Sequence, residues 1–395
     1  MTVEEIVRVA LEANPQVRGA RARWSSAVHS INQSYMPADP LFSFFNLDSP
    51  TNGFSKPASR SYQVTQALQF PGKGFLQGKT AERAAEIARL EYEATLRDTR
   101  AQAEVAFYQV LLDRALTEVA AENAENLRKV RQVAQVAYAA NRVTQADFIS
   151  AQFDVAAAEQ QRRQFEVAEA NDCTALNQVL GRTPGEPLSL RTELDLPALQ
   201  TALEPLVARA AQVRQEIMQA ALSEENSATA LTLAKLEYAP DFSLGYTFND
   251  YRTSTAPPNP GQMQTHGLAL SFNMPLFFWE KQREDVTRAS FDLDAARDDL
   301  ESIKTQTAAL VTTLYRQARL AQQTATLYHD TLGPLAQQAF EVALVAYQSG
   351  KVDFVTLATT LRQRNDARVA YLQAANQFLA QRIALEQAIG EPLPQ

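Results

Sequence analysis

The chain has 395 residues and a formal net charge of −8, which argues against a nucleic-acid-binding groove. Its single cysteine, Cys173, excludes an intrachain disulfide framework and a cysteine-based zinc cluster. No stretch approaches the roughly 18 consecutive apolar residues that a transmembrane helix requires. Glycine is sparse, with 13 residues, and alanine, glutamine, glutamate, arginine and leucine dominate long stretches, which favours long helices and coiled coils.

The N-terminal segment is predicted to be helical from about Thr2 to Met36. An interruption is expected at Asn14-Pro15, because a residue that precedes proline disfavours the helical conformation. The first residues lead directly into this amphipathic helix without the pattern of a signal peptide. Taken alone, this start predicts a cytosolic protein.

Two strands and two long helices are predicted next. The segments Leu41–Leu47 and Ser61–Phe70 are rich in aromatic and β-branched residues and are separated by a turn-rich segment, which predicts strands. Residues 79–138 contain neither proline nor glycine, so we expect a helical rod from Gly78 to Tyr138 on the order of 90 Å long. After a break at Asn141-Arg142, a helix from Thr144 to Leu180 is predicted.

The second half of the chain is predicted to contain the same elements in the same order. They are a helix from about Leu199 to Tyr238, strands at 241–251 and 263–274, a long helix from about Trp279 to Tyr347 interrupted at Gly333-Pro334, and a return helix at 353–389.

The sequence itself is also duplicated. Pro40-Leu41-Phe42-Ser43 recurs as Pro240-Asp241-Phe242-Ser243 at an offset of 200, the second strands match at 204, and the helix tips match at 209. Collinear matches with a slowly growing offset indicate a tandem duplication with small insertions. We therefore predict repeats at residues 1–181 and 198–395, joined by a linker at 182–197.

The predicted fold class is mainly α with a small β part. In the long helix of the second repeat, apolar or small residues from Leu293 to Leu314 alternate steps of three and four, the rhythm of a coiled-coil seam. Small residues in that seam favour further helices packing around it. Each repeat is thus a helix–hairpin–helix–helix unit.

The strands of the second repeat alternate large apolar residues with small or polar ones. Their length of about 9 to 11 residues is that of a strand which crosses a bilayer at barrel tilt, and the alternation is typical of lipid on one side and water on the other. The predicted lipid-facing residues are Phe242, Leu244, Tyr246, Leu268, Leu270 and Phe272.

An ordinary half-buried sheet in a soluble protein would show the same period of two. Four strands cannot close a barrel, however, and an open sheet edge cannot stand in lipid. If the strands span a membrane, several chains must therefore contribute to one barrel.

The chain resembles the TolC-type outer-membrane efflux family over nearly its whole length. The resemblance rests on the duplicated order of elements and on three sequence stretches: Leu11-Glu12-Ala13-Asn14-Pro15, Phe70-Pro71-Gly72-Lys73 and Tyr347-Gln348-Ser349-Gly350-Lys351. Pro71-Gly72-Lys73, together with Ala38-Asp39-Pro40, is most similar to the branch that works with heavy-metal cation exporters.

The resemblance implies a homotrimer in the outer membrane, with a twelve-stranded β-barrel and a helical tunnel in the periplasm. It implies a passive conduit, with metal cations as one candidate cargo, that docks a periplasmic adaptor protein and an inner-membrane pump of the RND type. The family is exported by a signal sequence and some members carry a lipidated N-terminal cysteine; neither pattern is present in this chain.

The resemblance also places the inner aperture and the adaptor-docking tips at the two helix turns. The candidate residues are Tyr138, Asn141, Arg142, Asp147, Tyr347, Gly350, Lys351 and Asp353. Asp147 matches a gate-type acidic position, but its counterpart in the second repeat is Thr356, so a double acidic ring is not implied. The alternative is that these are solvated loop charges, each worth under about 1 kcal/mol.

No other chemistry is indicated. The three histidines show no metal-ligand spacing and no nucleophile–base arrangement is visible, so we expect no catalytic site, no cofactor and no resident metal. The competing functional interpretation is a soluble structural coiled-coil protein whose β-hairpins cap helical rods.

Overall fold

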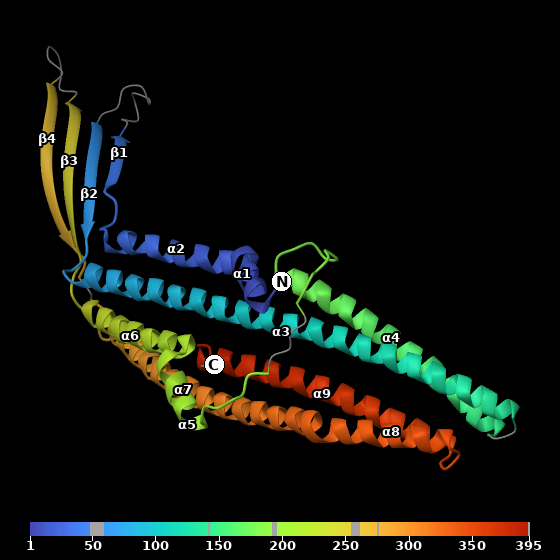
Figure 1. Cartoon of the computed structure of the whole chain (residues 1–395). Coiled ribbons are helices and arrows are strands. Elements are labelled where there is room, and N and C mark those ends of the chain that lie inside the picture. The colour runs from blue at the N-terminus through green and yellow to red at the C-terminus, as the bar shows by residue number, and fades with distance from the viewer. Residues whose placement is uncertain (48–58, 141–142, 192–195, 254–260, 275, 394–395) are drawn as a thin grey trace. The chain divides into compact units, whose positions relative to one another are not determined.

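A computed structural model describes residues 1–47, 59–140, 143–191, 196–253, 261–274 and 276–393. The order of elements runs twice along the chain (Figure 1). The first run comprises α1 (Val3–Ala13), α2 (Pro15–Tyr35), β1 (Leu41–Leu47), β2 (Ser59–Leu68), α3 (Lys73–Ala139) and α4 (Gln145–Val179). The second comprises α5 (Leu203–Val213), α6 (Gln215–Leu236), β3 (Phe242–Thr253), β4 (Gly261–Phe272), α7 (Lys281–Leu327), a π-helical turn (Tyr328–Leu332), α8 (Gly333–Gln348) and α9 (Phe354–Ile389).

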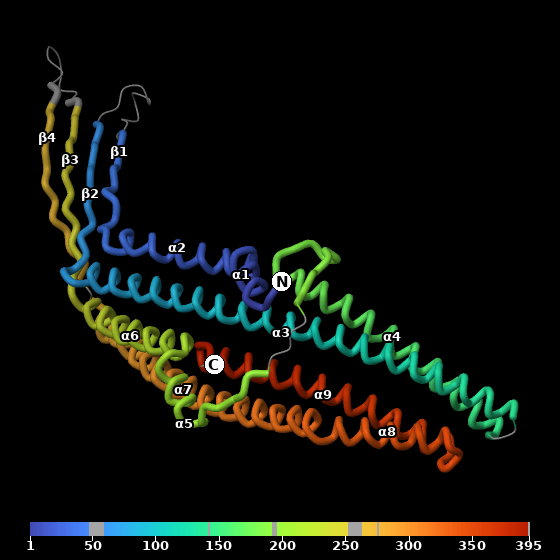
Figure 2. The backbone as a smooth tube through the Cα atoms, in the orientation of Figure 1, coloured from blue at the N-terminus to red at the C-terminus, as the bar shows by residue number. Residues whose placement is uncertain are grey.

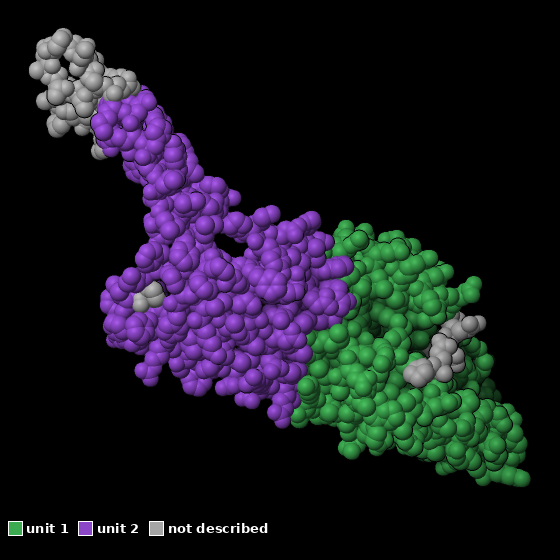
Figure 3. All heavy atoms as spheres, turned by 90° about the vertical axis from the view of Figure 1, so that its left-hand side faces the viewer, with its two compact units in different colours: residues 1–21, 91–218, 303–395 green, residues 22–90, 219–302 purple. Residues whose placement is uncertain are grey.

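The chain divides into two compact units, each of which takes segments from both halves of the sequence (Figure 3). One unit contains residues 1–21, 91–218 and 303–395 and is helical. The other contains residues 22–90 and 219–302 and carries the strands. These units do not follow the predicted repeat boundaries at 181 and 198, which remain a prediction about the duplication.

The helical unit has two cores built from equivalent positions of the two halves. In one, Ile6 and Ala10 of α1 pack with Phe107 of α3 and Leu176 and Leu180 of α4. In the other, Leu206 and Ala210 of α5 pack with Val311 of α7 and Leu385 and Ile389 of α9. The two sets correspond at the offsets of 200, 204 and 209 that the sequence shows, so duplicated residues bury the same three-helix contact.

One predicted helix is divided in the structure. The single helix expected from Leu199 to Tyr238 is broken at Arg214, whose backbone is extended with ψ at 124°. The Arg214 guanidinium donates to the Ala388 carbonyl at 3.1 Å and to Glu216 at 3.0 Å, which holds the corner. At the offset of 200, Arg214 corresponds to Asn14, where the break before Pro15 was predicted and is found.

Three further corrections concern the long helices. α3 begins at Lys73, five residues before the predicted start, and the predicted interruption at Gly333-Pro334 is a π-helical turn through which the helix continues. Such a turn absorbs an inserted residue without ending the helix. The seam also shifts by one position, since Leu310 is 41% exposed whereas Val311 is fully buried.

A pair of carboxyl groups lies between α3 and α4 in the helical unit. Asp113 is only 4% exposed, and burial together with a hydrogen bond to Asp172 raises the pKa of Asp113 to about 7. A hydrogen bond between two carboxyl groups requires a proton on one of them. The folded state therefore retains a proton that an unfolded aspartate releases at much lower pH.

This retained proton predicts a loss of stability with rising pH. The pKa of Asp113 is raised on folding. Protonation of Asp113 therefore contributes fully to the stability of the folded state below the unfolded pKa of 3.8, and this contribution is lost as pH rises towards about 7. We expect the free energy of unfolding of the parent protein to fall by about 2–4 kcal/mol over this pH range, and we expect Asp113→Asn to remove this fall. Chemical denaturation followed by circular dichroism at several pH values measures it.

Glu118→Gln, at an exposed position of the same helix, is the matched control. Parallel pH profiles for Asp113→Asn and the parent protein would contradict the shared proton.

Candidate functional site

The strands form one antiparallel sheet in the order β1-β2-β3-β4 (Figure 2). β2 and β3 belong to different halves of the sequence and pair from Ser59–Tyr251 to Leu68–Phe242. Among the described residues, β1 and β4 each pair on one side only. The sheet therefore has two edges whose backbone groups remain available to a further strand.

The six strand residues predicted to face lipid lie on one face of this sheet. Phe242 pairs with Phe272, Leu244 with Leu270, and Tyr246 with Leu268, so they form three successive rungs. Val64 extends the rung of Tyr246 onto β2. Leu268 and Leu270 are more than two-thirds exposed, so the protomer itself provides no core for this face.

A row of aromatic rings crosses all four strands one rung beyond Tyr246 and Leu268. Phe44, Tyr62, Phe248 and His266 are successive partners in the register. Their ring centroids lie 5.1, 6.1 and 5.2 Å apart in that order. This row cannot be predicted from the sequence alone, because the register that aligns the four rings comes from pairing between distant strands.

The opposite face carries small and polar residues. Ser243 pairs with Ser271, Gly245 with Ala269, and Thr247 with Gly267. Large apolar residues also project on this face, namely Leu41 and Phe45 on β1 and the pair Tyr251 and Met263 near the opposite end of the sheet. The sheet thus separates an apolar surface from a largely polar one.

A buried ion pair connects the sheet to its helices. The Lys73 side chain, at the start of α3, is 2% exposed and contacts Asp241 at 3.0 Å and Glu237 at 3.1 Å. Asp241 also accepts the Phe70 amide at 2.7 Å. The end of β2, the start of α3 and the start of β3 are therefore held at one charged centre, which no pattern in the sequence predicted.

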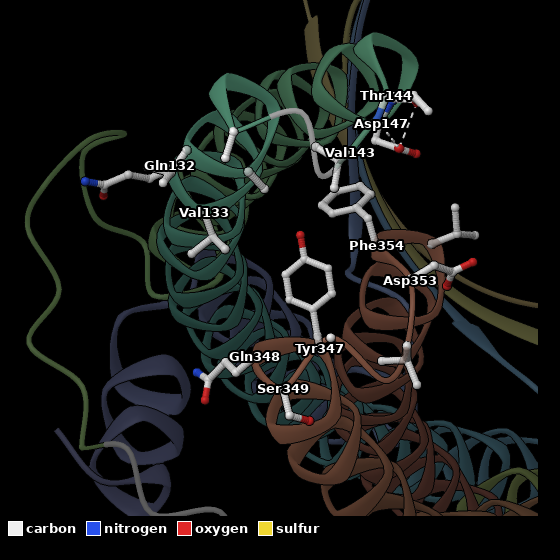
Figure 4. Close-up of a pocket in the computed structure, with 16 residues that line it drawn as sticks. Gln132, Val133, Val143, Thr144, Asp147, Tyr347, Gln348, Ser349, Asp353 and Phe354 are labelled. Carbon is white, nitrogen blue, oxygen red and sulfur yellow. Dashed lines mark hydrogen bonds between the residues drawn. The ribbon is translucent and has the colours of Figure 1, made fainter.

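The two helix turns at the far end of the helical unit meet around a cleft of about 980 Å³. The α3–α4 side contributes Val136, Val143 and Asp147, and the α8–α9 side contributes Tyr347 and Asp353. Figure 4 shows the Tyr347 side chain pointing into the space between the two turns, whereas the Asp353 carboxylate points away from it. The structure thus brings four predicted tip residues, Asp147, Tyr347, Gly350 and Asp353, around one opening.

Two further predicted tip residues, Tyr138 and Lys351, do not line the cleft. Tyr138 stacks on Phe148 with centroids 5.8 Å apart. Gly350 follows the end of α8 with φ at +73°, a left-handed conformation that favours glycine. Lys351 is exposed beside it. Asn141 and Arg142 lie outside the residues that the structure describes.

Asp147 and Asp353 both cap helices. Asp147 accepts the Thr144 amide at 2.9 Å while Thr144 accepts the Asp147 amide, a capping box at the start of α4. Asp353 accepts the Thr356 amide at 2.9 Å at the start of α9, and its hydrogen bonds with Thr356 lower the pKa of Asp353. Burial, and then the charge of Asp147, raises the pKa of Tyr347. The Thr144-x-x-Asp147 spacing would have revealed the first cap in the sequence.

Behind the cleft, α9 is tied to α3 by arginines that the sequence analysis missed. Arg364 and Arg368 contact Glu122 at 2.8 and 2.6 Å, and the Arg364 guanidinium also lies over the Phe340 ring of α8. Arg362 contacts Asp154 of α4 at 3.3 Å. Only the i, i+4 spacing of the last two arginines is visible in the sequence; their partners lie more than 200 residues away.

Within the described residues, no group of three or more histidine, cysteine or acidic side chains is arranged to hold a metal ion. None of the helices in the described ranges has both the length and the apolarity needed to cross a bilayer.

Comparisons with known proteins agree with this geometry. Residues 206–391 match the model of the outer membrane efflux protein family. The cobalt-zinc-cadmium resistance protein CzcC of Cupriavidus metallidurans is 22% identical over 399 residues, covering 99% of this chain and 90% of CzcC.

Solved structures share the fold over nearly the whole chain. The outer-membrane channel OprN is 20% identical with a TM-score of 0.81, covering 98% of this chain and 89% of OprN. CusC, whose structures concern folding and transmembrane channel formation, is 15% identical with a TM-score of 0.83. The match covers 98% of this chain and 92% of CusC.

The fold is that of TolC-type channel proteins, and the expected resemblance is confirmed. Residues 206–391 are therefore similar in sequence to outer membrane efflux proteins, in agreement with that resemblance.

Proposed function

We propose that this chain is one protomer of a homotrimeric outer-membrane duct. Three four-stranded sheets join into a twelve-stranded barrel, and the long helices form a tunnel in the periplasm. The observation that carries the proposal is the sheet, which has an apolar face and two edges that pair on one side only. In lipid an unpaired backbone group costs several kcal/mol, so β4 of one protomer requires β1 of its neighbour.

The duct works passively within a tripartite efflux system. An inner-membrane pump, of the RND type, supplies the energy, and a periplasmic adaptor connects the pump to the helix tips. The cargo is proposed to be metal cations, on the strength of the relative CzcC, a cobalt-zinc-cadmium resistance protein. The formal net charge of −8 favours cations over anions along the conduit. No enzymatic activity is assigned.

The aperture and the adaptor-docking surface are proposed to lie at the cleft between the two helix turns. The residues assigned to it are Tyr138, Asn141, Arg142, Asp147, Tyr347, Gly350, Lys351 and Asp353. Val136, Phe153 and Val345 remain more than half exposed on the helices next to the turns. Such apolar residues favour contacts with neighbouring helices, either of the trimer or of an adaptor.

The trimer is the direct test of this function. We expect mass measurement in mild detergent to give three copies of the chain, and the protein to partition with outer membranes. A monodisperse monomer with an intact sheet, or a protein that stays soluble without detergent, would instead favour the structural coiled-coil interpretation.

The orientation of the sheet can be tested on adjacent residues of β3. We expect Leu244→Arg, near the bilayer midplane, to cost about 2–4 kcal/mol of folding free energy in lipid vesicles, because a cation is then exposed to acyl chains. Ser243→Arg projects from the opposite face and should cost much less. Equal losses in urea titrations of the two variants would mean that the lipid-facing side has been misassigned.

The aperture can be tested by separating charge from helix capping. Asp147→Asn removes the charge but retains an acceptor for the cap of α4, whereas Thr144→Ala removes about 1 kcal/mol of capping and keeps the charge. We expect Asp147→Asn combined with Arg142→Gln to raise single-channel conductance in planar bilayers, and Thr144→Ala alone to leave it unchanged.

High salt should reproduce part of that increase in the parent protein, because screening weakens exposed ion pairs. Parent-like conductance of the double variant at every salt concentration would show that these tip charges do not close the aperture.

A further inference from the structure

The segment that joins β4 to α7 exposes a cluster of large apolar side chains. Leu276, Phe277, Phe278 and Trp279 are 60%, 67%, 48% and 54% exposed. The rings contact one another, with Trp279 at 6.2 Å from Phe277 and 5.1 Å from Phe278 between centroids. Phe278 also lies 6.5 Å from Tyr238. An exposed patch of this kind marks an interaction surface.

The backbone of this segment is ordered by its own hydrogen bonds. The amides of Glu280 and Lys281 donate to the Phe277 carbonyl at 3.1 and 2.9 Å, and the Arg283 amide donates to the Phe278 carbonyl at 3.1 Å. The rings are therefore presented by a turn that leads directly into α7. Lys281 and Arg283 are exposed immediately after them.

The connection does not need aromatic residues to make this turn. At the offset of 204, Phe277 and Trp279 correspond to Lys73 and Phe75 in the first half of the chain. There the same strand-to-helix step is made with Gly72 at φ +100° and with Lys73 buried against Asp241. Only the second connection therefore exposes a continuous run of four large apolar residues.

The cluster continues the apolar face of β4. Leu268, Leu270, Phe272 and Met274 are exposed at alternate positions leading to it. Eight residues separate His266, in the aromatic row, from Met274, which corresponds to about 27 Å along a strand. At a barrel tilt of about 40° this span covers about 21 Å of membrane depth, slightly less than the roughly 25 Å apolar band that lies between two aromatic girdles.

We propose that Leu276, Phe277, Phe278 and Trp279 form a lipid anchor in the periplasmic leaflet of the outer membrane, present once per protomer. The apolar rings contact the part of the acyl chains nearest to the headgroups. The indole N–H of Trp279 reaches the ester and headgroup layer, and Lys281 and Arg283 lie among the phosphates. This inference rests on the proposed function, since it requires the sheet to be a barrel wall.

Trp279 is a built-in reporter, because the chain contains two tryptophans and Trp24→Phe leaves it alone. The trimer is reconstituted into phosphatidylethanolamine–phosphatidylglycerol vesicles that carry nitroxide quenchers either near the headgroup or near the acyl end. We expect blue-shifted emission, stronger quenching by the shallow label than by the deep one, and quenching by aqueous iodide weaker by about threefold than for free tryptophan.

A second reporter separates this anchor from the function on which it rests. In the variant Trp24→Phe/Trp279→Phe/Leu270→Trp, the only tryptophan lies on the strand face and should be quenched by the deep label. If this strand reporter is quenched by lipid but Trp279 only by iodide, the anchor is overturned and the duct stands. If both respond only to iodide, the proposed function fails as well. If Trp279 is shielded from iodide and lipid labels alike, a protein surface covers the cluster, and the lipid anchor is wrong.

A substitution then tests the contribution of the neighbouring rings. Phe277→Ser combined with Phe278→Ser, in the Trp24→Phe background, should reduce shallow quenching of Trp279 and increase its access to iodide. Phe291→Ser is the matched control, because Phe291 is also exposed on α7 but lies twelve residues, or about 18 Å of helix, beyond Trp279. Unchanged quenching in the double variant would contradict the anchor.

Discussion

The two half-paired edges of the sheet are the constraint on which the proposed assembly depends. A strand edge carries backbone donors and acceptors that water satisfies and lipid does not. With β1 and β4 paired on one side each, the apolar face of this sheet can enter a bilayer only if another chain completes both edges. In the proposed duct, oligomerisation and barrel closure both follow from this requirement.

The duplication provides the framework, and the differences between its two copies provide specialisation. Equivalent residues such as Ala10 and Ala210 bury equivalent three-helix cores. The strand-to-helix junctions differ: one encloses Lys73 in a charged pocket, whereas the other exposes Phe277 at the equivalent position. In the proposed homotrimer these two kinds of strand-to-helix junction alternate around the axis. The symmetry is therefore threefold, although the duplication gives six similar repeats.

At the helix turns, Asp147 takes part in both a local and a distant interaction. Asp147 has an ordinary local role as the partner of Thr144 in a capping box, and its charge also acts on Tyr347 across the cleft. The arginines of α9 hold Glu122 of α3 and Asp154 of α4 nearby. Any movement that separates α9 from α3 and α4 must disrupt these contacts as well as those at the turns.

The sequence by itself determined the order of elements, the duplication, the alternating strands and the break at Asn14-Pro15, because these depend on period, proline and local propensity. The break at Arg214 can be inferred from the sequence only because Arg214 corresponds to Asn14 in the repeat, since no proline follows Arg214. The tertiary structure alone decided the aromatic row of Phe44, Tyr62, Phe248 and His266, the burial of Lys73 and the partners of Glu122. Each of these depends on the register or packing between segments far apart in the chain, and no local pattern encodes which distant residue will be opposite.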